Sequence, residues 1–282
     1  MTLQQWVEKG EAQLLAGPHP ERARRDSELL LLHVIRRERA GLLARWKEVL
    51  PEDEAANYIE MLARRAAGEP MQYIFGETEF YGLPFRVTRD VLIPRPETEH
   101  LVEAVLHKVS ALAAPRIADV GTGSGAIAVA LAHALPHAIL TAIDISQRAL
   151  LLAEDNARRN GVAGRIRFLR GSILTPAAGE RFDIIVSNPP YVPAGDRATL
   201  TVEVREHEPG LALFAGADGL DVIRRLIPEA LAALVPGGCL AMEFGFGQQP
   251  AVSSLLQAAG FAEIEFTADL QGIPRVACAQ RT

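Results

Sequence analysis

The stretch Ile117-Ala118-Asp119-Val120-Gly121-Thr122-Gly123-Ser124-Gly125 decides the fold class of this 282-residue chain. Its apolar first residues predict a buried strand, and the apolar segment 126–135 after the glycines predicts a helix. Glycine lets the backbone turn tightly and lets a ligand approach the main chain closely. The start of the helix adds N–H groups that have no partner inside the helix. The stretch therefore predicts a ligand site at the carboxyl end of a strand, although a glycine-rich turn alone is weak evidence.

The same alternation of strand and helix continues from residue 97 onward. Short apolar runs at 117–120, 139–145, 166–169, 184–186 and 240–244 are separated by helical segments. Two further β-like runs, at 262–266 and 275–278, close the chain. This order predicts an α/β fold with a doubly wound, mostly parallel sheet.

The residues before this α/β region have a different character. In residues 1–75, apolar side chains such as Leu3, Trp6 and Val7 recur at helical spacing, which predicts a small helical-bundle domain. The residues at 26–28, DSE, offer a cap for the helix that carries the leucines at 29–32, unless that helix begins before them. Residues 76–96 alternate aromatic and β-branched side chains around a turn at 82–84, which predicts a β-hairpin linker. We therefore expect three parts: 1–75, 76–96 and a catalytic domain at 97–282.

Composition excludes several classes of protein. Hydrophobic residues make up 49% and charged residues 23%, values ordinary for a soluble globular protein. No apolar run approaches the ~18 residues that span a bilayer, so we expect a cytoplasmic protein with no membrane partner. Cys239, Cys278 and the scattered histidines predict neither a disulfide framework nor a metal site. The net charge of −6 argues against nucleic-acid binding. The arginines at 21–47 alternate with acidic residues and indicate first a solvated surface, and second a docking face.

The stretch DIIVSNPPY ends in Asn188-Pro189-Pro190-Tyr191. Apolar and small residues lead into it as a buried strand, and two prolines then end the strand because they donate no ladder hydrogen bonds. The Asn188 side-chain oxygen and the Pro189 carbonyl offer two fixed acceptors, which could hold an –NH2 group by both hydrogens. An ordinary turn explains the same residues equally well, since Asn and Pro are frequent turn residues.

Asp144 lies about twenty residues after the glycines, at the end of the second strand of the α/β region. A carboxylate there can accept both ribose hydroxyls of a dinucleotide or adenosyl cofactor, or else cap the helix that follows. The turn reads GxGxG instead of the dinucleotide fingerprint GxGxxG, and it lacks a P-loop lysine. Asp119 would repel a pyrophosphate but tolerates the cationic sulfonium and amino group of S-adenosylmethionine. Local charge therefore favours the methyl donor over NAD.

The turn DVGTGSG, Asp144 and NPPY together resemble class I S-adenosylmethionine-dependent methyltransferases that modify planar –NH2 groups. The segments EPMQYIFGETEFYG, LIPRPETEHLVE, AGADGLDVIRRL and EFGFGQ make nearly the whole chain similar to the release factor glutamine methyltransferase family. The segment PRPETE at 94–99 is the most discriminating mark. A sister family that acts on a ribosomal protein carries a different sequence there.

The resemblance implies a seven-stranded class I methyltransferase sheet and an N-terminal domain that docks the substrate. It also implies methylation of a glutamine amide nitrogen, N5, in the Gly-Gly-Gln motif of class I peptide chain release factors, with S-adenosylhomocysteine as the second product. Carried over by motif, the catalytic residues are Asn188, Pro189 and Tyr191. The cofactor residues are Gly121, Thr122, Gly123, Ser124, Gly125, Asp144, Ser172, Ile173 and Asn188, and the substrate residues are Asn188, Pro189, Pro190 and Tyr191.

Residues 170–174, RGSIL, depart from the wider methyltransferase pattern, which often has an acidic residue near the adenine amino group. Ser172 could accept that hydrogen bond instead, and Ile173 could pack on the ring. Arg95, Glu97 and Glu99 shape the substrate entrance, or form an ion pair or helix-start charges. The alternative functions are a ribosomal-protein glutamine methyltransferase, a DNA adenine-N6 methyltransferase, which would need a basic groove and base flipping, and a non-catalytic binding module.

Overall fold

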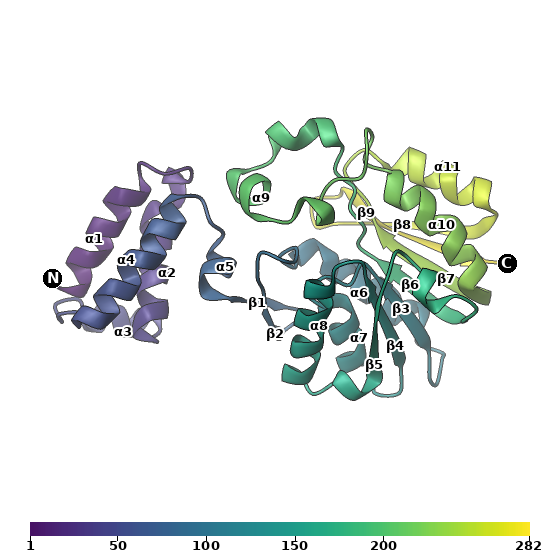
Figure 1. Cartoon of the computed structure of the whole chain (residues 1–282), viewed down its shortest axis with the longest axis horizontal. Coiled ribbons are helices and arrows are strands. Elements are labelled where there is room, and N and C mark those ends of the chain that lie inside the picture. Colours follow the sequence, from purple (N-terminus) through teal and green to yellow (C-terminus); the bar gives the residue numbers. More distant parts are fainter. The chain divides into compact units, whose positions relative to one another are not determined.

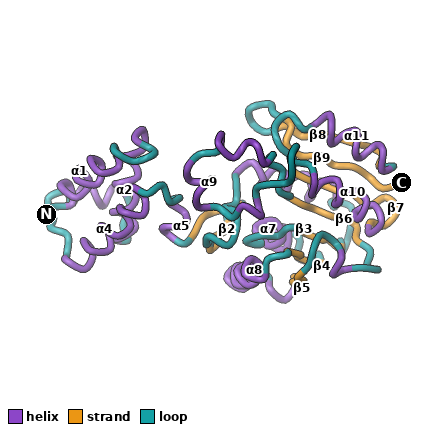
Figure 2. The backbone as a smooth tube through the Cα atoms, turned by 45° about the horizontal axis from the view of Figure 1, so that its top comes forward, coloured by secondary structure: helices purple, strands orange, loops and turns teal.

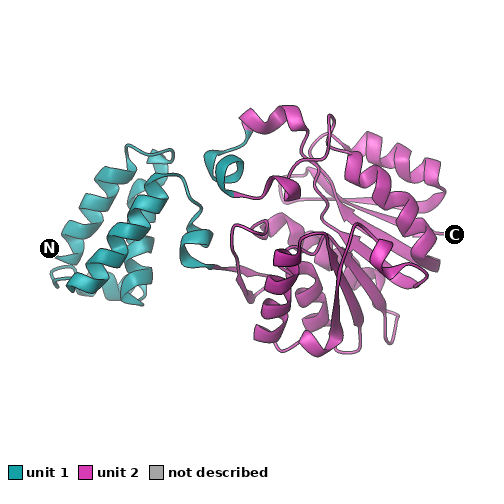
Figure 3. Cartoon of the chain, in the orientation of Figure 1, with its two compact units in different colours: residues 1–76, 200–207 teal, residues 77–199, 208–282 magenta. Residues whose placement is uncertain are grey.

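The computed structural model describes the backbone of residues 1–282 and their side chains apart from that of Leu43. The chain forms two compact units (Figure 3), residues 1–76 with 200–207, and residues 77–199 with 208–282. The short segment 200–207 thus belongs to the first unit, although both of its neighbours in sequence belong to the second. The predicted domain boundaries at residues 75 and 96 did not anticipate that residues 200–207 join the first unit. Both boundaries stay predictions.

The first unit is helical, as Figure 2 shows. Its long helices are α1 (Leu3–Leu14), α2 (Ala23–Ile35) and α4 (Glu52–Ala66), with the shorter α3 (Arg39–Ala44), α5 (Met71–Phe75) and α9 (Val202–His207). Trp6, Leu30 and Tyr58 are buried in a shared core. A capping box starts α1, in which the Thr2 hydroxyl accepts from the Gln5 N–H. The prediction of a helical N-terminal region is confirmed.

The polar residues at 26–28 do not cap α2, because the helix begins three residues earlier, at Ala23. They lie inside the helix and are buried. The Ser27 hydroxyl donates to the Val7 carbonyl at 2.7 Å, and Asp26 accepts from Arg65 Nε at 2.7 Å. Buried polar groups need such partners, so these side chains join helices in the core instead of starting one.

The second unit begins with a two-stranded antiparallel hairpin, β1 (Glu77–Phe80) and β2 (Leu83–Arg86). Phe80 pairs directly with Leu83, so the turn is Tyr81-Gly82, and both of these residues have positive φ. The predicted turn at 82–84 is therefore wrong by one residue, because Leu83 and Pro84 already belong to β2. The main sheet has the order β5-β4-β3-β6-β7-β9-β8. Its strands are β3 (Arg116–Val120), β4 (Ile139–Asp144), β5 (Ile166–Arg170), β6 (Phe182–Ser187), β7 (Leu234–Glu243), β8 (Phe261–Ala268) and β9 (Pro274–Arg281).

Five neighbouring strands of this sheet, β3 to β7, are parallel, and β9 pairs antiparallel with both β7 and β8. Helices cover both faces (Figure 1). The helices α6 (Glu99–Lys108), α7 (Ala126–Ala134) and α8 (Gln147–Arg159) share one core with the sheet, and α10 (Asp221–Ala233) and α11 (Gln249–Ala259) share the other. The predicted doubly wound, mostly parallel sheet is confirmed.

The strand order reverses direction between β3 and β6. From β3 the chain first builds outward through β4 and β5, and then returns to place β6 on the other side of β3. Ligands of open α/β sheets bind at the carboxyl ends of the strands beside such a reversal. The glycine turn follows β3 and Asn188 follows β6, so both predicted sites lie at this point.

Short 3₁₀ helices complete the chain, at Pro20–Arg22, Pro96–Thr98, Ala163–Arg165, Thr175–Ala177, Ala194–Thr199 and Gly210–Ala212. Among the described residues, no helix combines the length and the apolar character needed to cross a membrane.

Candidate active site

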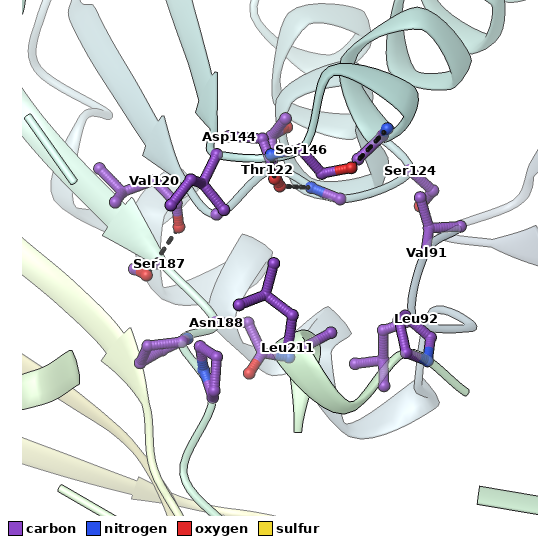
Figure 4. Close-up of a pocket in the computed structure, with 18 of the residues that line it drawn as sticks. Val91, Leu92, Val120, Thr122, Ser124, Asp144, Ser146, Ser187, Asn188 and Leu211 are labelled. Carbon is purple, nitrogen blue, oxygen red and sulfur yellow. Dashed lines mark hydrogen bonds between the residues drawn. The ribbon is translucent and has the colours of Figure 1, made fainter. Parts of the chain in front are cut away.

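A cavity of about 410 Å³ opens at the carboxyl edge of the sheet beside the strand reversal. The segments after β3, β4, β5 and β6 form its walls, together with residues from 89–95 and 209–212. Figure 4 shows Asn188 across this cavity from Thr122 and Asp144. The two stretches that the sequence singled out therefore face one space.

The glycine turn forms one wall of the cavity. Gly121 and Gly123 have φ values of 74° and 56°, in the left-handed region that favours glycine. A Cβ atom on Gly121 would meet nothing within 4 Å, so the backbone there borders open space. Gly125 differs, because it does not line the cavity and a Cβ on it would lie 3.0 Å from Ala153 of α8. Gly125 allows two helices to pack closely.

Asp119 lies fully buried beneath this turn and does not line the cavity. Its Oδ2 accepts from the Thr122 hydroxyl at 2.6 Å and from the Ala128 N–H at 3.1 Å, while its Oδ1 is buried without a hydrogen-bond partner among the described residues. Burial raises the pKa of Asp119 to about 7, and the two hydrogen bonds oppose that rise. Asp119 accepts both hydrogen bonds and so holds the turn in shape, and above about pH 7 it also places negative charge beneath the turn.

Asp144 is half-buried at the cavity wall, at the end of β4. Its Oδ1 accepts from the Ser146 N–H at 2.8 Å, and its Oδ2 accepts from the Gly123 N–H at 2.9 Å. The cap of α8 is Ser146, whose hydroxyl accepts from Ala149 N–H. Each carboxylate oxygen of Asp144 keeps a further lone pair for a hydroxyl donor. Burial raises its pKa, and the backbone hydrogen bonds oppose that rise.

Ser172 and Ile173, after β5, form another part of the wall. The Ser172 hydroxyl accepts from the Arg225 guanidinium of α10 at 2.9 Å. Ile173 is buried and has a φ of 51°, a genuine outlier for a β-branched residue. Such strain is found at functional sites, where the surrounding structure holds it in place.

Asn188 is half-buried at the end of β6, and its Nδ2 donates to the Thr98 hydroxyl at 3.0 Å. Asn188, Pro189 and Pro190 line the cavity. Tyr191 does not line it. Its hydroxyl donates instead to Oε1 of Glu243 at 3.0 Å.

The prediction of site residues missed the buried side chains of Thr98 and Glu243, which contact the NPPY stretch. It also missed the cavity-lining Leu92 and Leu211, which Figure 4 labels. The segments PRPETE and EFGFGQ did contain the first two, but no spacing pattern in the sequence pairs them with residue 188.

Comparison with known proteins identifies the family. A release factor glutamine methyltransferase of Moorella thermoacetica is 46% identical over 92% of this chain and 91% of its own length. The chain belongs to the release factor glutamine methyltransferase family. A member from Geobacter sulfurreducens is 44% identical over 93% of this chain and 91% of its own length. The chain is therefore a methyltransferase, as its sequence predicted.

Two family models and a solved structure agree with this family membership. The PrmC N-terminal domain matches residues 5–76, and the Methyltransferase small domain matches residues 97–205. The crystal structure of the hMettl16 catalytic domain is 17% identical, with a TM-score of 0.58 over 81% of each chain. At that identity it shows the shared class I methyltransferase fold and nothing about the substrate.

Proposed function

We propose that this enzyme transfers a methyl group from S-adenosylmethionine to the side-chain amide nitrogen, N5, of the glutamine in the Gly-Gly-Gln motif of class I peptide chain release factors. The observation that carries the proposal is that Asn188 and Pro189 line the same cavity as the glycine turn. The two acceptors proposed to bind the substrate amide therefore face the glycine turn proposed to bind the cofactor. The names of the relatives support the release factor as partner, and we expect the reaction in the cytoplasm without direct contact to nucleic acid.

The cavity fits the methyl donor in shape and charge. The open space above Gly121 leaves room for a ligand against the backbone, and Asp119, which is ionised above its pKa of about 7, then favours a cation there. We assign the ribose hydroxyls to Asp144, whose oxygens have lone pairs to spare, and the adenine to Ser172 and Ile173. S-adenosylmethionine supplies an electrophilic methyl group and leaves as S-adenosylhomocysteine.

The residues of the NPPY stretch orient the substrate. A carboxamide nitrogen is a poor nucleophile because its lone pair is delocalised into the carbonyl, so orientation carries much of the catalysis. The Asn188 Oδ1 and the Pro189 carbonyl each accept one hydrogen of the glutamine amide. The same two oxygens stabilise the positive charge that develops on nitrogen, as fixed dipoles. The nitrogen gains the methyl group and loses one proton to solvent. The packing of Tyr191 on the glutamine stays a prediction.

The variant Asp119→Asn tests the charge beneath the turn. Because burial raises the pKa of Asp119 to about 7, the native state disfavours the ionised form, and the penalty is complete above pH 7 and absent below about pH 4. We expect the variant to raise the free energy of unfolding by about 1–3 kcal/mol at pH 8 and to leave it unchanged near pH 4. Denaturant unfolding followed by circular dichroism measures this.

The same variant should weaken S-adenosylmethionine binding by about tenfold in calorimetric titration at pH 8, where Asp119 is ionised and the variant removes a nearby negative charge. Tighter cofactor binding, or a loss of stability at pH 8, would refute this role of Asp119. S-adenosylhomocysteine lacks the sulfonium charge, so its affinity should fall less than that of the methyl donor.

Labelled methyl donor tests the substrate. The enzyme is incubated separately with a release factor, with duplex DNA and with ribosomal protein, and incorporated label is counted. We expect label in the release factor alone. Label in DNA or in ribosomal protein would support the corresponding alternative, and label in none of them would leave the chain without the proposed activity.

A further inference from the structure

A chain of hydrogen bonds links the NPPY stretch to two side chains that are distant in sequence. Asn188 Nδ2 donates to Thr98 Oγ1 at 3.0 Å, and Thr98 Oγ1 donates to Glu243 Oε2 at 2.7 Å. The other oxygen of Glu243 accepts from the Tyr191 hydroxyl at 3.0 Å. Thr98 lines the cavity but is only 4% exposed, and Glu243 is only 2% exposed, so both side chains are well shielded from solvent.

The donors and acceptors in this chain can be assigned from proton counting. An ionised carboxylate only accepts, so the single hydroxyl proton of Thr98 points to Glu243. The Thr98 oxygen is then left as an acceptor, and Asn188 can offer it only the –NH2 end of its amide. The amide oxygen of Asn188 is consequently turned away from Thr98.

We propose that Thr98 and Glu243 are positioning residues that fix the Asn188 amide with its oxygen, and not its –NH2 group, toward the substrate. The inference rests on the proposed function, because only an –NH2 substrate requires an acceptor there. In the reversed orientation the –NH2 group of Asn188 would face the –NH2 group of the glutamine, and no hydrogen bond could form between them. The proposal gives the segment PRPETE, which contains Thr98, a role in catalysis.

The charge state of Glu243 controls which groups donate and which accept in this series of hydrogen bonds. Burial raises its pKa, whereas the hydrogen bonds from Thr98 and Tyr191 and the nearby Arg275 of β9 lower it, and Glu97 raises it. A neutral Glu243 can donate its own proton to Thr98, which frees the Thr98 proton for the oxygen of Asn188 and reverses the amide. The ionised form is therefore active, and turnover should fall as the pH drops through the pKa of Glu243.

Two variants break this series of hydrogen bonds at different points. Thr98→Val keeps the shape of the side chain and removes the hydroxyl, while Glu243→Leu removes the acceptor and leaves the Thr98 proton to Asn188. We expect each variant to lower kcat on the release factor by on the order of 10- to 100-fold. S-adenosylhomocysteine affinity, measured by calorimetry, should stay within about threefold, which also shows that the variants are folded. Thr98→Ser keeps the hydroxyl and should restore most of the rate.

A double-mutant cycle shows whether Thr98 acts through Asn188. In the Asn188→Ala background, Thr98→Val should lower the remaining rate by less than about threefold, because no amide is left to orient. Thr141→Val, which removes another buried threonine hydroxyl, is the control for general damage to the sheet. The decline of kcat at low pH should also disappear in Thr98→Val.

Several results would overturn the proposal. One is an unchanged kcat in Thr98→Val or in Glu243→Leu, and another is an equal loss from Thr98→Val in both backgrounds. A wild-type enzyme that does not modify the release factor would instead refute the proposed function itself, so the two failures are distinct.

Discussion

Replacing Asn188 by alanine should lower the single-turnover rate of methyl transfer to a release factor by about 100- to 1000-fold. That range is typical for the loss of one preorganised polar group that stabilises developing charge. Asn188 lies at the end of a strand in the middle of the sheet, and its –NH2 group is held by Thr98. Because the Asn188 side chain is already fixed, its oxygen is a preorganised acceptor. In the alanine variant a water molecule would have to be ordered in its place, which costs free energy.

A saturating concentration of methyl donor separates this effect from weaker cofactor binding, because Asn188 is also predicted to contact the cofactor. Gln257→Ala, which removes an exposed amide side chain of α11 in the same unit, is the matched control and should keep the wild-type rate. A rate for Asn188→Ala within about tenfold of the wild type would contradict the proposed orientation of the amide.

The second large effect concerns stability, and it lies in the helical unit. Arg65 is 2% exposed and donates to Asp26 of α2 and to Glu203 of α9. Removing one partner of a buried ion pair leaves uncompensated charge, at a cost of about 3–5 kcal/mol. We therefore expect Arg65→Met to lower the free energy of unfolding of this unit by about 3–5 kcal/mol.

Tryptophan fluorescence can follow this unit alone, because both tryptophans of the chain, Trp6 and Trp46, belong to it. Denaturant unfolding of Arg65→Met is compared with that of Arg25→Met, which removes an exposed arginine of α2 and should change little. A difference below about 1 kcal/mol between the two variants would show that the ion pairs of Arg65 add no net stability.

Much of the fold could be predicted because its signals are local. Parallel strands buried on both faces are continuous apolar runs, and these alternate with helical periodicity along residues 97–282. The start of α2 could not be predicted in this way. Asp26 and Ser27 have the composition of a helix cap, but their partners Arg65 and Tyr58 lie on α4, more than thirty residues later. Only the tertiary structure shows that these polar groups are buried and paired.

The candidate site could likewise be predicted only where its residues have local sequence signatures. The strand ends with the glycine turn, Asp144 and Asn188 have local signatures, and parallel topology brings such ends to one edge of a sheet. Tyr191 shares the NPPY signature, yet its side chain turns to Glu243 instead of the cavity. Thr98 lies 90 residues from its partner Asn188 and 145 residues from its partner Glu243, so no local pattern predicts these contacts.

The central claim is that the enzyme methylates one glutamine amide, and mass spectrometry of the release factor tests it most directly. The release factor is incubated with S-adenosylmethionine and either the wild-type enzyme or Asn188→Ala, and its Gly-Gly-Gln peptide is then fragmented. We predict one added methyl group on the glutamine side chain with the wild-type enzyme, and at most a trace with the variant. An unmodified peptide, or a methyl group on another residue, would contradict the account.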